Sequence, residues 1–200
     1  AGQGIALVDR AEDLGAFLEP GSAALIWRRP TPPNIQMWLD DLNPDAMPKG
    51  RVTLPVYAVP QTVTALCDMA GTPAGLERTW LEDDISVLAT AFADLVNARF
   101  LRLRLDVITT NACRRFHVDA IHSRLICTYR GTGTQYGHSR RGEDPSRVFT
   151  AAVGAPMLLR GSLWPPQPDN GLVHRSPPIE GTGETRLVLV LDPVTDLMED

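Results

Sequence analysis

The hydrophobic period of the chain changes at residues 100–107, which read Phe100-Leu101-Arg102-Leu103-Arg104-Leu105-Asp106-Val107. Before this stretch, from about Trp80 to Phe100, apolar residues recur at helical spacing. Within it, apolar and charged residues alternate, which is the pattern of a strand that buries one face. The sequence therefore predicts a long helix followed directly by a half-buried strand, and we expect the helix to back a sheet.

Upstream of this transition, prolines interrupt the chain, with seven of them between residues 30 and 60. A short strand is predicted at residues 23–27, a helix at 33–39 and a second helix at 61–70, which stops at a Gly-Thr-Pro sequence. We expect residues 1–100 to form an N-terminal helical support segment.

Downstream of the transition, six further strands are predicted, all short and separated by turns that contain glycine. They span residues 114–119, 124–130, 148–153, 156–160, 171–175 and 185–192. Short strands at this spacing favour an all-β sandwich or barrel over βαβ units. The predicted fold class is mainly β with N-terminal helices. Residues 101–200 are expected to form a jelly-roll or cupin-like barrel that makes one compact domain with the helices.

Composition argues against several classes of function. The net charge is −5, and Lys49 is the only lysine beside eighteen arginines, so no basic stripe for nucleic acid is present. No apolar run is long enough to span a bilayer, and we expect a soluble, cytoplasmic protein that binds neither membranes nor nucleic acid. The three cysteines include no Cys-x-x-Cys pair and are expected to be reduced thiols.

A metal site is predicted from the stretch Phe116-His117-Val118-Asp119 together with His174. Residues i and i+2 of a strand share a face, so His117 and Asp119 can point at one ion while a neighbouring strand supplies His174. Two imidazoles and one carboxylate form the facial triad of non-haem Fe(II) oxygenases, which leaves coordination positions open for substrates. We predict these three residues as metal ligands. The simpler alternative is a buried His–Asp hydrogen bond that fixes a strand.

Arg186 follows His174 by twelve residues and lies on the predicted strand 185–192. Its guanidinium can form a bidentate pair with a carboxylate inside an otherwise apolar barrel. It can instead pair with Glu184 or Asp192 at the barrel rim.

Four other side chains compete with Arg186 or assist it in holding a bound carboxylate. They are Arg124, Arg175, Tyr129 and Thr128. The alternative for the tyrosine is an ordinary position in the core.

The order His117-x-Asp119, His174, Arg186 resembles that of the Fe(II)- and 2-oxoglutarate-dependent dioxygenases over roughly residues 100–192. The resemblance implies a double-stranded β-helix, in which the triad binds Fe(II) and Arg186 holds the distal carboxylate of 2-oxoglutarate. Arg124, Tyr129 and Thr128 are further candidates for binding this co-substrate.

Residues 113–119 and 124–134 resemble more closely a bacterial domain-of-unknown-function family. That family has no settled activity, so the resemblance supports the site more than the reaction. It also carries an association with zinc-limitation gene neighbourhoods, which suggests a role in zinc homeostasis as an alternative.

Three functions are therefore compared. The leading hypothesis is an Fe(II)- and 2-oxoglutarate-dependent oxygenase that acts on an unknown small molecule or peptide. The second is a non-catalytic, cupin-like metal-binding or zinc-homeostasis protein. The third is a zinc hydrolase, for which the sequence offers no obvious spare carboxylate as general base. Cys113 shares strand parity with His117, and a thiolate ligand there would favour zinc; we expect it to be a spectator.

Overall fold

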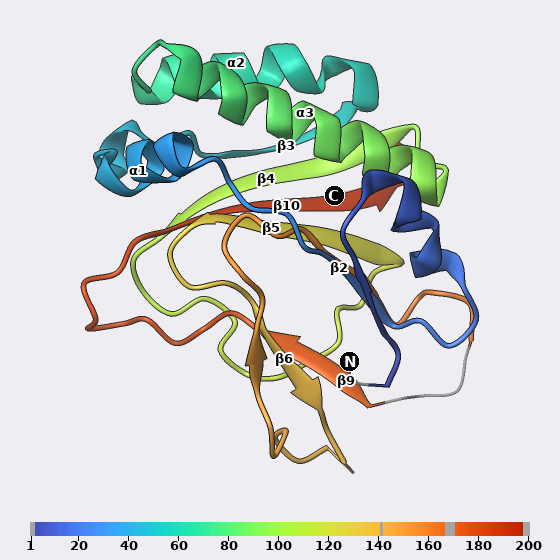
Figure 1. Ribbon diagram of the computed structural model, residues 1–200. Helices are drawn as coiled ribbons and strands as arrows, with labels where there is room; N and C mark the ends of the chain where they lie inside the picture. The colour runs from blue at the N-terminus through green and yellow to red at the C-terminus, as the bar shows by residue number, and fades with distance from the viewer. Residues whose placement is uncertain (1–2, 141, 167–170, 198–200) are drawn as a thin grey trace.

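The computed structural model describes residues 3–140, 142–166 and 171–197, and within these ranges the strands form two sheets (Figure 1). The larger sheet has the strand order β1-β2-β8-β5-β10-β4-β3, and the smaller sheet has the order β7-β6-β9. Neighbouring strands are antiparallel except β1 and β2. The strands are β1 (Ile5–Val8), β2 (Ala24–Trp27), β3 (Gly50–Pro55), β4 (Phe100–Ile108), β5 (Ser123–Arg130), β6 (Gln135–His138), β7 (Phe149–Thr150), β8 (Met157–Arg160), β9 (Leu172–Arg175) and β10 (Arg186–Val194).

The α-helices cover the outer face of the larger sheet, on the side away from β6 and β9 (Figure 1). They are α1 (Pro33–Asp41), α2 (Val59–Ala70) and α3 (Leu76–Val96), with short 3₁₀ helices at Ala11–Leu18, Pro44–Ala46 and Val56–Ala58. The long helix α3 ends before the predicted Phe100 because Asn97 adopts the left-handed conformation, with φ 56°, which asparagine tolerates and which stops a helix. No helix in the described ranges is long and apolar enough to cross a membrane.

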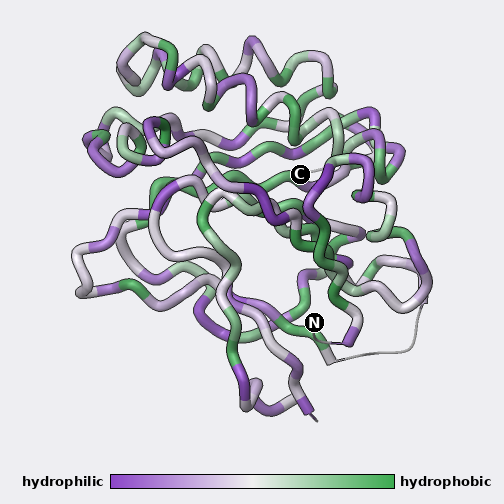
Figure 2. The backbone as a smooth tube through the Cα atoms, in the orientation of Figure 1, coloured by the Kyte–Doolittle hydropathy of each residue, from purple (hydrophilic) through white to green (hydrophobic). Residues whose placement is uncertain are grey.

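The main core lies between α3 and the larger sheet. Leu81, Ile85 and Leu88 repeat along α3 at helical spacing and are fully buried. They pack with the leucines of β4 and β10, and Figure 2 shows hydrophobic segments along these central strands. Each such side chain stabilises the fold by about 1.5–3 kcal/mol relative to an exposed position.

The strand register decides which residues face the second sheet. Leu189 of β10 pairs with Leu105 of β4 and with Cys127 of β5, so odd-numbered residues of these three strands point toward the helices. Their even-numbered residues point the other way, toward β6 and β9. Arg104 and Asp106, two charged positions of the predicted strand at 100–107, therefore line the space between the two sheets.

The structure confirms a mainly β protein with helices, but it differs from the sequence prediction in two respects. First, the described strands do not close into a barrel. Second, the first hundred residues contribute β1 and β3, which the sequence did not predict, in addition to the predicted β2; β1 and β3 form the two edges of the larger sheet. The sequence pattern did not reveal β1 and β3, because β1 is only four residues long and polar residues interrupt the apolar residues of β3.

The predicted strand at 114–119 is also absent. In this segment His117 alone forms a β-bridge, with His174 of β9. The carbonyl of Asp119 already accepts a hydrogen bond from Ser162 N, 2.9 Å away, so the chain leaves β9 for the segment after β8 within two residues. The alternating pattern of residues 114–119 therefore belongs to a segment that passes from β9 to the residues after β8, and not to a regular strand.

Candidate metal centre

The bridge between His117 and His174 brings two imidazoles side by side. The backbone amide of each residue donates to the carbonyl of the other, at 2.9 and 3.0 Å, and the ring centroids lie 4.5 Å apart. Because paired residues in an antiparallel bridge project to the same side, the histidines face one point although they are distant in sequence.

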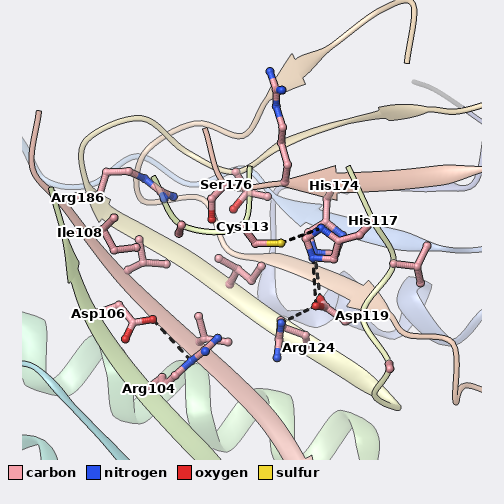
Figure 3. Close-up of a pocket in the computed structure, with 18 residues that line it drawn as sticks. Arg104, Asp106, Ile108, Cys113, His117, Asp119, Arg124, His174, Ser176 and Arg186 are labelled. Atoms are coloured by element: carbon pink, nitrogen blue, oxygen red, sulfur yellow. Dashed lines mark hydrogen bonds and ion pairs between the residues drawn. The ribbon is translucent and has the colours of Figure 1, made fainter. Parts of the chain in front are cut away.

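Asp119 completes the cluster. Its Oδ1 lies 3.3 Å from His117 Nε2, and its Oδ2 lies 3.0 Å from His174 Nε2 (Figure 3). One ligand atom from each of the three residues falls within 4.8 Å of the others. The geometry thus brings together the three side chains that the sequence singled out, and their binding of a metal stays a prediction.

A hydrogen bond to the backbone fixes the orientation of the His117 ring. Its Nδ1 lies 2.7 Å from the carbonyl oxygen of Arg115, an arrangement in which Nδ1–H donates and Nε2 keeps its lone pair for the cluster. A hydrogen bond from the remote ring nitrogen to a backbone carbonyl is typical of metal-ligating histidines.

The carboxylate of Asp119 is kept ionised by its neighbours. Burial alone would raise its pKa, but His174, Arg124 and His117 together lower the pKa to about 2. Arg124 Nη1 lies 2.8 Å from Asp119 Oδ1, and the same guanidinium forms a bidentate pair with Asp192 at 2.7 and 2.8 Å. Arg124 therefore holds the carboxylate in place from the floor of the site.

The residues fit a divalent metal ion. Asp119 Oδ2 is buried and makes no hydrogen bond of acceptable geometry, despite the short contact with His174. A buried carboxylate oxygen without a hydrogen-bond partner is costly, and an ion between it and two imidazole nitrogens would satisfy it. Two nitrogens and one carboxylate oxygen suit Fe(II), and they also suit zinc.

The cluster lies at one end of a cavity of about 380 Å³ between the two sheets. Arg186 lies at the opposite end of this cavity in Figure 3. Its side chain is 1% exposed, and its Nε donates to the carbonyl of Thr132, 2.7 Å away. Burial lowers the pKa of Arg186 to about 10, against the attraction of Glu184 and Asp106.

Arg186 has no ion-pair partner among the described residues. The rim pairing considered from the sequence does not form, since Glu184 accepts hydrogen bonds from the backbone and hydroxyl of Thr132 and Asp192 is bound by Arg124. The Nη atoms of Arg186 are thus available to a ligand in the cavity.

The other predicted co-substrate residues are placed differently. Arg124 lines the cavity but is committed to two carboxylates. Arg175 also borders it, yet its guanidinium stacks on Phe116 and contacts Gln135. Tyr129 lies on the opposite face of β5, where its hydroxyl donates to Asp84 Oδ2, 2.7 Å away.

Thr128 is 3% exposed and is not among the residues that line the cavity. The hydroxyl groups of both residues could bind a carboxylate. Tyr129 is odd-numbered and therefore faces the helices, and Thr128 lies where the register between β5 and β10 shifts.

Cys113 lines the cavity without joining the cluster of three ligands. Its Sγ lies 3.6 Å from Nδ1 of His117, on the side of the ring remote from Nε2 (Figure 3). The strand parity that placed it beside the ligands does not apply, because this segment is not a strand.

Two charged residues of the cavity were not predicted as functional. Arg104 and Asp106 on β4 line it, from a strand that the sequence marked only as half-buried. Their alternation with leucines was the available signal. It shows that one face is polar, but not that this face looks into a cavity instead of solvent.

Solved structures share this fold at low sequence identity. AtDAO1, the dioxygenase for auxin oxidation 1 from Arabidopsis thaliana, in its binary complex with 2-oxoglutarate, matches with a TM-score of 0.56 and 11% identity over 98% of this chain and 94% of that chain. The dioxygenase for auxin oxidation from rice matches with a TM-score of 0.51 and 14% identity over 95% and 83%. The fold therefore resembles that of these two dioxygenases, which agrees with the fold that the order of the triad and Arg186 implied.

Sequence comparison identifies the family. No curated protein gives a significant match to this chain. The model of a family described as "Protein of unknown function (DUF1826)" matches residues 8–192, which agrees with the resemblance seen at residues 113–134. Because the match covers nearly the whole sequence, the chain belongs to the DUF1826 family.

Proposed function

We propose that this protein is an Fe(II)- and 2-oxoglutarate-dependent oxygenase. The observation that carries the proposal is one cavity with the His117, Asp119 and His174 cluster at one end and a buried arginine at the other. The described residues offer this arginine no carboxylate as an ion-pair partner. The first fits a divalent metal, and the second fits the distal carboxylate of a short dicarboxylate. The fold shared with AtDAO1 and the rice dioxygenase supports the same proposal.

Each residue has a defined task in this proposal. His117, His174 and Asp119 would hold Fe(II), and Arg186 would bind the far carboxylate of 2-oxoglutarate. The bound metal and co-substrate supply the activation of oxygen. Arg124 keeps Asp119 ionised and oriented. Val188, Val190 and Ile126 line the cavity with apolar surface.

The test is an anaerobic titration of the purified protein with Fe(II) and then with 2-oxoglutarate. We expect stoichiometric metal binding followed by the weak visible charge-transfer band of the chelate, and succinate release when oxygen is admitted. Metal binding without any band or succinate would contradict the oxygenase.

The same titration distinguishes a zinc protein. The three ligands also suit zinc, so a non-catalytic metal-binding or zinc-homeostasis role predicts zinc in protein purified without metal affinity resin, and no effect of 2-oxoglutarate on metal retention. The oxygenase predicts that 2-oxoglutarate and metal bind more tightly together than alone.

A further inference from the structure

The cavity contains a second guanidinium that the proposed function does not use. Arg104 projects into it from β4 (Figure 3). It forms an ion pair with Asp106, in which Nε lies 3.6 Å from Oδ2, too long for a hydrogen bond. Both Nη atoms are without a partner in the described part of the chain. Arg104 and Arg186 are thus two arginines in one cavity whose forks remain open.

The two forks differ in depth. Arg186 is 1% exposed, whereas the side chain of Arg104 is 31% exposed and its partner Asp106 is 38% exposed. Arg186 therefore offers the deeper position for an anion, and Arg104 offers the more accessible one. Between them the floor is apolar, formed by Ile108, Val188 and Val190.

The surroundings of Arg104 also favour an anion. Asp106 and Asp119 are the only carboxylates among the described residues that line the cavity, and Asp119 belongs to the metal cluster. On the neighbouring strand β3, the residue directly paired with Arg104 is Arg51, another cation. Arg51 is exposed and lies outside the lining of the cavity, so it offers a matched positive charge against which the role of Arg104 can be tested.

We propose that Arg104 recognises the substrate, and that the substrate is a small organic anion with an apolar body. This inference rests on the proposed function and deepens it. The carboxylate or phosphate of the substrate displaces the long contact with Asp106 and pairs with the Arg104 fork, while its apolar part covers the valine and isoleucine floor. A cavity of about 380 Å³ is near the lower end of small-molecule sites, which span about 300–1,000 Å³, so it suits a small molecule better than a folded partner.

The experiment measures binding instead of turnover, using Zn(II)-loaded protein in the presence and absence of 2-oxoglutarate. The probes are 4-phenylbutyrate, its uncharged amide and 3-phenylpropylphosphonate. Ligand-detected NMR titration measures the affinity of the protein for each probe. We expect wild type to bind the better of the two anions at least about tenfold more tightly than the amide, since a charge-assisted hydrogen bond is worth that factor or more. The ratio of carboxylate to phosphonate affinity identifies which anion the site prefers.

Four variants separate recognition by Arg104 from a general effect of positive charge and from a structural ion pair. Arg104→Gln should lose about tenfold in anion affinity and leave the amide unchanged. Arg104→Lys keeps the charge but not the fork, so its affinity for the anion should fall between those of wild type and Arg104→Gln. Asp106→Asn should bind the anion more tightly because it removes the competing carboxylate. Arg51→Gln, which removes a nearby exposed charge outside the cavity lining, should behave as wild type.

The opposite results overturn the inference. These are equal binding of acid and amide, no binding of either anion at millimolar concentration, equal losses in Arg51→Gln and Arg104→Gln, or weaker binding in Asp106→Asn, as a structural ion pair would give. Loss of anion binding in Arg186→Leu with none in Arg104→Gln also overturns it. If 2-oxoglutarate fails to bind but Arg104→Gln alone loses the probe, the oxygenase proposal fails and the anion site stands.

Discussion

Each face of strand β5 lies beside a largely buried arginine, and the two arginines have opposite surroundings. On the helix side, Arg29 forms a bidentate pair with Asp84 at 2.6 and 2.7 Å, and Tyr129 donates to the same carboxylate. On the cavity side, the only hydrogen bond that Arg186 makes within the described residues is from its Nε to the carbonyl of Thr132. One guanidinium is saturated by the protein, and the other is not.

The pKa values follow this difference. Burial tends to lower the pKa of both groups. The paired Asp84 raises the pKa of Arg29, whereas Glu184 and Asp106 only partly offset the effect of burial on Arg186, whose pKa falls to about 10. A buried charge that the protein neutralises belongs to the scaffold. A buried charge that it leaves unneutralised costs stability, and this cost is understandable if a ligand supplies the counter-charge.

The largest expected effect is on metal binding at the cavity face. His117→Ala should abolish stoichiometric metal and leave the protein folded, because the core between α3 and the larger sheet does not depend on this polar cluster. Metal content after loading and desalting, together with circular dichroism, measures both. His138→Ala is the control, since His138 contacts the backbone of Gln3 outside the cluster. Undiminished metal in His117→Ala would refute the triad.

On the helix side of β5, a substitution should change stability and leave metal binding intact. Asp84→Asn leaves Arg29 buried without its counter-charge and should lower the free energy of unfolding by about 3–5 kcal/mol, the usual cost of breaking a buried pair. Metal affinity of the folded variant should be unchanged. Chemical denaturation measures the first quantity. Asp83→Asn on the exposed side of α3 is the matched control and should stay near wild type. A loss below about 1 kcal/mol would mean that the network is not structural.

The direct comparison replaces each arginine by leucine. Arg29→Leu should destabilise the protein, while Arg186→Leu should not, and should weaken 2-oxoglutarate binding by about 1.5–3 kcal/mol with Fe(II) binding nearly intact. Calorimetric titration of each variant with 2-oxoglutarate gives the affinities. Equal affinity in wild type and Arg186→Leu would remove the co-substrate role of Arg186.

The smallest effect is expected at Cys113. Its Sγ approaches His117 from the side of the ring that faces away from the cluster, so Cys113→Ser should keep Fe(II) affinity within a few-fold of wild type. A metal–sulfur distance of about 2.3 Å in X-ray absorption would show a thiolate ligand instead and would assign the cavity face to zinc.

Some of this organisation was predictable from sequence. The helix that became α3 and the strand that became β4 follow from periodicity, because a helix and a half-buried strand repeat their apolar residues at different intervals. The three clustered residues could be found because the chain has only four histidines, so few combinations of a His-x-Asp pair with a later histidine exist. The positions of Tyr129 and Thr128 were not predictable to the same degree, since a residue type does not reveal which face of a strand is filled by helices.

The sequence by itself determined that β4 buries alternate residues, and that His117, Asp119, His174 and Arg186 are the side chains with suitable chemistry. Only the tertiary structure decided that His117 pairs with His174, that the carbonyl of Asp119 accepts a hydrogen bond from Ser162 N, and that Arg104 lines a cavity. The physical reason is range. Periodicity is a property of a few neighbouring residues, whereas a bridge, a cavity and an unpaired buried charge depend on segments that only long-range pairing brings together.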